Sequence, residues 1–204
     1  HDKLQYYTTE QFKKYIKQAK PKSDTSSEWG YYVFFNIAFY TGMRKGEINA
    51  LKWSDVDENV IHVRRSVTQK IKGKDIVETP PKNKSSYRDL YIPSALVKIL
   101  NQYKSIQKRD KRFTEDFRVC GGISCLSDSS IENHNKRYSE AAGLPHIRIH
   151  DFRHSHASLL VNNGILIQEV ARRLGHSKVD VTWNTYSHLY PKQETEALKV
   201  LESV

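Results

Sequence analysis

The apolar residues of this chain follow two different spacings, and their distribution restricts the fold more than any other sequence feature. Between residues 60 and 92, β-branched and aromatic residues gather in short runs, at 60–63, within 67–79 and at 87–92, which is typical of strands. Turns are predicted at Gly73 and at Pro80-Pro81. Almost everywhere else, apolar residues recur at helical intervals. The chain therefore combines many helices with a small amount of β-sheet.

The predicted helices lie on both sides of the strand segment. A capping-box pattern from Thr8 to Gln11 opens the first helix. Gly42, Gly164 and Gly175 stand where a left-handed glycine commonly ends a helix. The predicted helices cover residues 8–19, 29–40, 45–51, 94–108, 127–142, 150–163, 167–174, 179–189 and 192–201. We expect one mainly α domain with a small antiparallel β-sheet inserted near its middle, an α+β fold.

Positive charge is concentrated around the predicted sheet. The chain carries a formal net charge of +10, and residues 60–112 hold 14 Lys and Arg against four acidic residues, which accounts for all of that excess. A basic cluster favours polyanions, because each neutralised phosphate releases condensed counterions. A solvated basic surface explains the charge equally well. Charge alone therefore does not distinguish a polyanion-binding surface from a solvated one, and the sequence motifs are needed.

Composition excludes several classes of protein. Aromatic residues make up 11% of the chain, which argues against disorder, and no apolar run approaches the roughly 18 residues of a membrane span. Cys120 and Cys125 are too few for a disulfide framework or a zinc ribbon, so we expect reduced thiols in a cytoplasmic protein. The chain begins at His1 and its only methionine is Met43, which favours a piece of a longer protein.

Three short segments hold polar residues that a hydrophobic core would not require. The first is Thr-Gly-Met-Arg-Lys-Gly-Glu, in which Arg44 directly follows a predicted helix end. The second is His-Asp-Phe-Arg-His-Ser-His, in which His150 and Arg153 share a helix face. The third is Leu-Gly-His-Ser, with His176 ten residues before Tyr186. Each alone has a structural explanation, as a surface arginine, a polar helix face or a packed tyrosine.

The second segment also suggests a metal site. A helix places His150 and His154 on one face, but His156 points elsewhere, and no glutamate stands beside them as in a metalloprotease motif. A metal-dependent nuclease is disfavoured as well, because the sequence has no cluster of three acids at ligand spacing. We therefore expect no metal ion and no other cofactor.

In this order, the segments resemble the tyrosine recombinase family, in particular the integrases of temperate phages and conjugative transposons. The family signature is an arginine, a lysine on a β-hairpin, His-x-x-Arg, a histidine or tryptophan, and a tyrosine. The residues that follow this order are Arg44, His150, Arg153, His176 and Tyr186. The surrounding sequences Thr-Gly-x-Arg-x-x-Glu, Leu-Gly-His-Ser and Thr-Tyr-Ser-His are similar too. The match covers essentially the whole chain and implies the fold of a recombinase catalytic domain.

Two features are less complete than the family pattern. The run Pro-Lys-Asn-Lys offers two hairpin lysines; the distance to the following strand favours Lys82, and Lys84 is the alternative. Family members also carry an N-terminal core-binding domain, and the integrases often an arm-binding domain, neither of which fits before Thr8. We expect residues 1–204 to be the single C-terminal catalytic domain of a longer integrase.

The resemblance implies that the Tyr186 hydroxyl attacks a DNA strand, forming a 3′-phosphotyrosyl link and a free 5′-hydroxyl. This covalent link retains the phosphodiester energy, so rejoining needs no ATP. Arg44 and Arg153 would stabilise the charge on the phosphate oxygens, because guanidinium groups remain charged and donate forked hydrogen bonds. Glu47 would orient an arginine through an ion pair.

Three further residues would move or hold protons in the same scheme. Lys82 would protonate the leaving oxygen, since neighbouring cations lower the pKa of a lysine towards a useful range. His150 would accept or shuttle the proton of the tyrosine, and His176 would donate a hydrogen bond to the phosphate.

The implied partner is double-stranded DNA, on which four copies form a homotetramer, with accessory DNA-bending or directionality factors and no membrane. The free chain would be a monomer or a weak oligomer. Residues 192–204 carry apolar side chains at helical spacing. They either pack on their own domain or dock in a groove of a neighbouring protomer.

Two other functions fit parts of the sequence. A catalytically silent DNA-binding regulator would share the helix-turn-helix character of residues 167–186. A type IB topoisomerase-like strand transferase would share the chemistry but act alone. The complete set of nucleophile and cations favours the recombinase over the regulator.

Overall fold

The computed structural model describes residues 3–69 and 76–204, and the predicted turn at Gly73 lies outside them. Along the chain, the short strands follow one group of helices and precede another, as the strand-like and helical spacings of apolar residues predict. The α-helices and strands in chain order are α1 (Thr9–Ala19), α2 (Trp29–Thr41), α3 (Lys45–Ala50), β1 (Val56–Asp57), β2 (Val60–Val63), β3 (Ser66–Thr68), β4 (Val77–Thr79), β5 (Arg88–Tyr91), α4 (Ser94–Gln107), α5 (Asp128–Ala142), α6 (Asp151–Asn162), α7 (Ile167–Leu174), α8 (Val179–Tyr186) and α9 (Glu194–Glu202).

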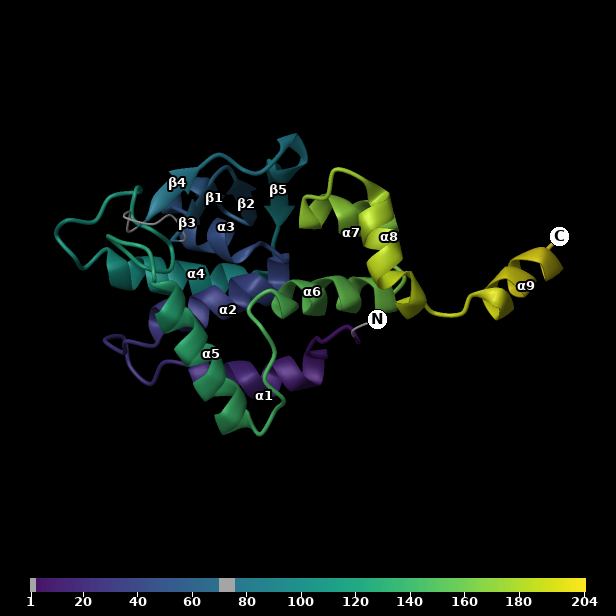
Figure 1. Cartoon of the computed structure of the whole chain (residues 1–204), viewed down its shortest axis with the longest axis horizontal. Helices are drawn as coiled ribbons and strands as arrows, with labels where there is room; N and C mark the ends of the chain where they lie inside the picture. The colour runs from purple at the N-terminus through teal and green to yellow at the C-terminus, as the bar shows by residue number, and fades with distance from the viewer. Residues whose placement is uncertain (1–2, 70–75) are drawn as a thin grey trace.

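The main core surrounds α2, which contacts α1, α4 and α6 (Figure 1). Apart from Gly30, Asn36 and Thr41, the residues of this helix are aromatic or aliphatic, and most of them are buried, as expected of a helix inside a core. At its centre, the rings of Tyr15, Phe35 and Phe152 lie 5.2–5.4 Å apart and are almost fully buried. Burial of each such side chain contributes about 1.5–3 kcal/mol, so these rings hold α1, α2 and α6 together.

The strands form two small antiparallel sheets, where the sequence indicated one. β2 pairs with both β1 and β5, with Ile61 opposite Leu90, and these two side chains face the core. β3 pairs with β4, with Ser66 opposite Thr79. Arg64 and Arg65, between β2 and β3, belong to neither ladder, which is why the strands divide into two sheets.

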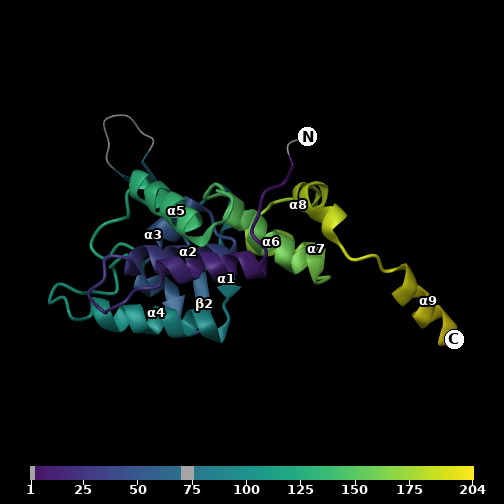
Figure 2. The same cartoon turned by 90° about the horizontal axis from the view of Figure 1, so that it is seen from below.

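The C-terminal third adds a second, smaller core. Val161 of α6, Val170 and Leu174 of α7 and Tyr186 of α8 pack together here. Beyond it the chain extends away from the body, and α9 projects into solvent in both views (Figures 1 and 2). All residues of α9 are exposed.

Most predicted helix boundaries agree with the structure to within two residues. The exception is the segment predicted as one helix over 179–189: α8 ends at Tyr186, and a 3₁₀ turn over Ser187–Leu189 follows it. Thr8 and Gln11 form the expected capping box of α1. No helix in residues 3–69 or 76–204 is long and apolar enough to cross a membrane.

Candidate active site

Arg44 lies at the corner between α2 and α3. The corner depends on Gly42, which has φ +68° at the end of α2 and whose missing Cβ would come within 2.6 Å of the His156 ring. The Arg44 amide then donates to Oε1 of Glu47 at 2.8 Å, which starts α3. Its Nη1 is buried and has no hydrogen-bond partner among the described residues. An unpaired buried donor costs about 1–3 kcal/mol, so this nitrogen is suited to an incoming acceptor.

Arg153 connects the first and third polar segments from its position on α6. Its side chain is almost fully buried; Nη1 donates to the carbonyl of Gly42 at 2.7 Å, and Nη2 donates to the carbonyl of Leu174. Burial, followed by the charges of Arg44 and Arg88, lowers the pKa of Arg153 to about 9. The guanidinium is thus held by backbone carbonyls, without a carboxylate partner among the described residues.

Arg44, His150 and Arg153 line one pocket of about 540 Å³, which we call the arginine pocket. His150 is the exposed N-cap residue of α6 at its rim. Partial desolvation and the charge of Arg153 lower the pKa of His150. Asp128 also lines this pocket and pairs with Lys45 at 3.3 Å. The structure therefore brings together three of the residues that the sequence predicted, from two separate segments.

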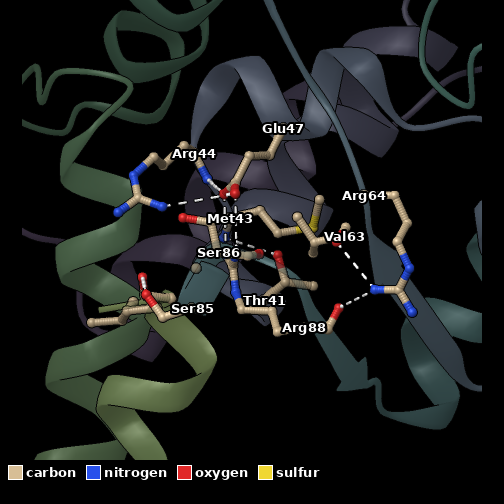
Figure 3. Close-up of polar contacts among 12 residues, drawn as sticks. Thr41, Met43, Arg44, Glu47, Val63, Arg64, Ser85, Ser86 and Arg88 are labelled. Carbon is tan, nitrogen blue, oxygen red and sulfur yellow. Dashed lines mark hydrogen bonds and ion pairs between the residues drawn. The ribbon is translucent and has the colours of Figure 1, made fainter. Parts of the chain in front are cut away.

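Glu47 is the centre of a buried ion-pair cluster that the sequence predicted only in part. It lies 3.7 Å from Arg44, but its closer partner is Arg88 of β5, at 2.9 Å and 3.0 Å (Figure 3). Burial alone would raise the pKa of Glu47, but the hydrogen bonds and charge of Arg88 outweigh it and lower that pKa. Glu47 therefore remains charged and aligns the arginine beside it.

Arg88 is absent from the residues that the sequence motifs predicted for the site, although its position in the strand was a signal. Leu90 and Ile92 point inwards, and the two-residue period of a strand places Arg88 on the same face. There it also donates to the carbonyls of Ser86 and Arg173, both at 2.7 Å. Arg88 thus joins the strand after the lysine run to Glu47 of α3 (Figure 3) and to the end of α7.

His176 is positioned by the end of α7. Gly175 ends this helix with φ +74°, and a Cβ there would lie 2.9 Å from the Arg88 guanidinium. The His176 ring is within 2.6 Å of the Thr182 hydroxyl through Nδ1. Partial burial, followed by the charges of Arg153 and Arg44, lowers the pKa of His176 to about 4. The neutral ring therefore stands near the two arginines that the sequence grouped with it.

Tyr186, the last residue of α8, is buried and faces α6. Its hydroxyl lies 2.5 Å from Nδ1 of His154. Burial raises the pKa of Tyr186 well above its usual value, although the charge of Arg153 acts in the opposite direction. The sequence motifs suggested His154 only as a possible metal ligand. The available signal was its position four residues after His150 on the same helix face.

Lys82 and Lys84 are both exposed, between β4 and β5. Neither side chain has a hydrogen bond or ion pair among the residues that the structure describes, although the backbone carbonyl of Lys84 accepts a hydrogen bond from the Tyr87 amide at 3.2 Å. The structure therefore does not bring either lysine to the arginine pocket, and the choice between them stays a prediction. In the same described ranges, no group of three His, Cys, Asp or Glu side chains could hold a metal ion.

Comparison with known sequences identifies relatives over nearly the whole chain. The model of the "Phage integrase family" matches residues 5–193. The ICEBs1 integrase of Bacillus subtilis (strain 168) is 32% identical over 99% of this chain and 55% of its own length. A XerC-like tyrosine recombinase of Caldanaerobacter subterraneus is 31% identical over 84% of this chain and 49% of its own. The chain spans about half the length of the curated relatives it matches.

Comparison with solved structures gives the same fold. The Tn1549 transposon integrase in complex with circular intermediate DNA matches with a TM-score of 0.75 and 17% identity, over 100% of this chain and 68% of that one. The catalytic domain of bacteriophage HP1 integrase matches with a TM-score of 0.61 and 21% identity, over 97% and 95% of the two chains. The mainly α fold with a small antiparallel sheet is confirmed.

Proposed function

The chain belongs to the phage integrase family of tyrosine recombinases, and from this membership we propose that it is a site-specific recombinase that integrates and excises a mobile element. Its substrate is double-stranded DNA; the structure of the similar Tn1549 integrase is a complex with circular intermediate DNA. The chain cuts and rejoins DNA strands through a covalent 3′-phosphotyrosyl intermediate.

One observation carries this proposal: the buried Nη1 of Arg44, which has no hydrogen-bond partner among the described residues, belongs to a side chain that lines the same pocket as Arg153. The Glu47 carboxylate lies 3.7 Å from this nitrogen, too far for a hydrogen bond, whereas a non-bridging oxygen of a bound phosphodiester would be an anionic acceptor at hydrogen-bond distance. Because the arginines are held by Glu47 and by backbone carbonyls, they need little rearrangement to stabilise a transition state. His176 adds a neutral ring beside the same oxygens.

Membership of the family supports the following reaction. The Tyr186 oxygen bonds to phosphorus as the phenol loses its proton, and the bond from phosphorus to the 5′ oxygen breaks. Lys82 approaches from the exposed segment before β5 when DNA is bound, and it protonates the 5′ oxygen. Rejoining is the reverse, with a 5′-hydroxyl as the nucleophile.

A library of nicked duplexes tests the proposal. On such substrates the cleaved end diffuses away, so the protein–DNA adduct accumulates. We expect an adduct at Tyr186, located by mass spectrometry, and none with Tyr186→Phe. Affinity for DNA should change little, because the substitution removes no positive charge. An adduct at Tyr190 would contradict the assignment, and binding without any adduct would identify a silent regulator.

A second test separates the two lysines. Lys82→Ala should slow cleavage by about 10²-fold or more, and a substrate with a 5′-thiol leaving group, which needs no proton, should recover most of the rate. Lys84→Ala should mainly weaken binding and lower the salt slope by about one. Rescue of Lys84→Ala by the thiol substrate would instead assign the general acid to Lys84.

We propose that four copies assemble on DNA by exchanging α9. The apolar side chains of α9 are exposed, including Leu198 and Leu201. On the body, an apolar groove of about 380 Å³ lies beside Trp183 and Leu166, which are 50% and 73% exposed. A helix from a second copy fits this groove by its few apolar anchors. Such a small contact favours assembly on DNA over assembly in dilute solution.

A further inference from the structure

His154 makes the one side-chain contact that the described residues offer to the hydroxyl of the candidate nucleophile. The distance from His154 Nδ1 to Tyr186 Oη is 2.5 Å, and the two rings are tilted by 58° with their centroids 5.7 Å apart. Tyr186 is 2% exposed, so water competes little for this hydroxyl. The contact joins α6 to α8 and is internal to the smaller core.

The surroundings of His154 determine which nitrogen accepts a hydrogen bond. Its Nε2 lies 3.9 Å from Oδ1 of Asp151, a buried carboxylate. This carboxylate is fixed by the backbone and guanidinium nitrogens of Arg148, at 2.8–3.2 Å. A nearby carboxylate favours the tautomer with hydrogen on Nε2. Nδ1 is then the acceptor, and the tyrosine hydroxyl donates to it.

The ring is also in the form that can accept a proton. Burial, followed by the charge of His150, lowers the pKa of His154 to about 4, so the ring is neutral at pH 7. The charged and titratable groups that face it are Asp151, Arg148, His150 and Arg153 around α6, and Tyr186 from α8. Asp151 is the one anion in this set, and it would stabilise an imidazolium once formed.

The two neighbouring histidines have different surroundings. His150 lines the arginine pocket, and among the described residues it has no hydrogen bond to Tyr186. His154 packs edge-on against His150, with ring centroids 5.1 Å apart, and points to the tyrosine. The geometry therefore separates a histidine that lines the arginine pocket, His150, from a histidine that contacts the candidate nucleophile, His154.

We propose that His154 is a further catalytic residue, which accepts the proton of Tyr186 as the phenolic oxygen attacks phosphorus. The Oη–H bond breaks and an Nδ1–H bond forms, while the bond to the 5′ oxygen breaks and that oxygen takes its proton from Lys82. During rejoining, His154 returns the proton to the departing tyrosine. This assignment rests on the proposed function and transfers to His154 the role that the sequence suggested for His150.

Adduct formation on the nicked substrate tests the proposal with three variants. His154→Ala should slow adduct formation by about 10²-fold or more. His154→Asn keeps a hydrogen-bond acceptor near the position of Nδ1 but cannot take a proton, so it should be similarly slow. His146→Ala, at an exposed histidine outside the site, should retain the wild-type rate. Thermal midpoints and DNA affinities of all three should match the wild type.

Each outcome supports or contradicts the role of His154 as the acceptor of the Tyr186 proton. A wild-type rate in His154→Ala would overturn the proposal, and a wild-type rate in His154→Asn would reduce His154 to a positioning residue. If His154→Ala fails to fold, the pH profiles of wild type and His154→Asn replace it. The wild-type rate should fall on acidification as His154 protonates, and that step should be absent in His154→Asn; equal profiles would also overturn the proposal. Absence of any adduct with the wild-type chain would instead contradict the proposed function.

Discussion

The helices at the two ends of the chain have similar sequence patterns and opposite environments. Both carry apolar side chains at helical spacing, on α1 at Phe12, Tyr15 and Ala19 and on α9 at Leu198 and Leu201. The apolar side chains named on α1 are buried, whereas all residues of α9 are exposed. Helical spacing therefore identifies an apolar face but not the surface that covers it.

The two helices differ because α1 packs against other helices of its own domain, whereas α9 does not. The Phe12 ring stacks on Phe39 of α2, with centroids 3.9 Å apart, and the Tyr15 hydroxyl donates to Asn135 of α5 at 2.7 Å. α9 instead follows Pro191 and an extended segment that carries it away from α7 and α8 (Figure 2). Its apolar face is available to a second copy, whereas α1 is part of the core.

The largest difference in the free energy of unfolding should come from truncating one apolar side chain on α1 and one on α9. Phe12→Ala should lower the free energy of unfolding by about 3–5 kcal/mol, because it leaves a cavity under α2. Leu198→Ala should change it by no more than about 0.5 kcal/mol. Urea denaturation of both variants measures the difference. Equal losses would mean that α9 packs on its own domain in solution.

Acidification should lower the free energy of unfolding through His156, which is buried against α2. Burial, followed by the charge of Arg173, lowers the pKa of His156 to about 3. Between about pH 6.5 and pH 3 the unfolded chain therefore binds one proton more than the folded chain. The free energy of unfolding should fall as the pH falls through this window, by up to about 1.4 kcal/mol per pH unit from this residue.

Chemical denaturation at several pH values measures this slope. His156→Gln should show a smaller slope than the wild type, because the titrating group is gone. Removal of residues 192–204 should leave the slope unchanged, since α9 takes no part in this packing. A wild-type stability that does not vary over this window would contradict the environment of His156.

Substitutions at the start of α1 and of α9 should differ less in their effect on the free energy of unfolding. The Thr8 hydroxyl accepts a hydrogen bond from the Gln11 amide, and the Gln11 side chain accepts one from the Thr8 amide. Thr8→Ala should therefore lower the free energy of unfolding by about 1 kcal/mol. Thr195→Ala in the first turn of α9 is the matched control and should have almost no effect. The same denaturation experiment measures both, and a cost at Thr195 equal to that at Thr8 would remove the contrast.

Deletion of residues 192–204 removes more atoms than any of the substitutions above, but it should have the smallest effect on stability. The thermal midpoint should stay almost constant, because the deletion removes no buried side chain. Recombination and assembly on DNA should nevertheless be impaired if α9 docks on a neighbouring copy. Calorimetry and sedimentation with DNA test the two parts separately. Collapse of the fold would show that α9 packs on its own domain, and unchanged assembly would exclude its exchange.

The sequence by itself determined the helices, the strand segment and the candidate chemistry. These features depend on local patterns: the spacing of apolar residues, glycines that end helices at Gly42 and Gly175, and the order of Arg44, His150, Arg153, His176 and Tyr186. The resemblance to the family followed from that order and from the short sequences around these residues.

The tertiary structure decided which side chains act together. Arg88 meets Glu47 across 41 positions of the chain, and His154 meets Tyr186 across 32. A local period shows which way each side chain points but carries no information about a partner so far along the chain. The division into two sheets and the exposure of α9 also depend on packing between distant elements. Such contacts exist only once the chain has folded, because burial against a particular surface is a property of the whole molecule.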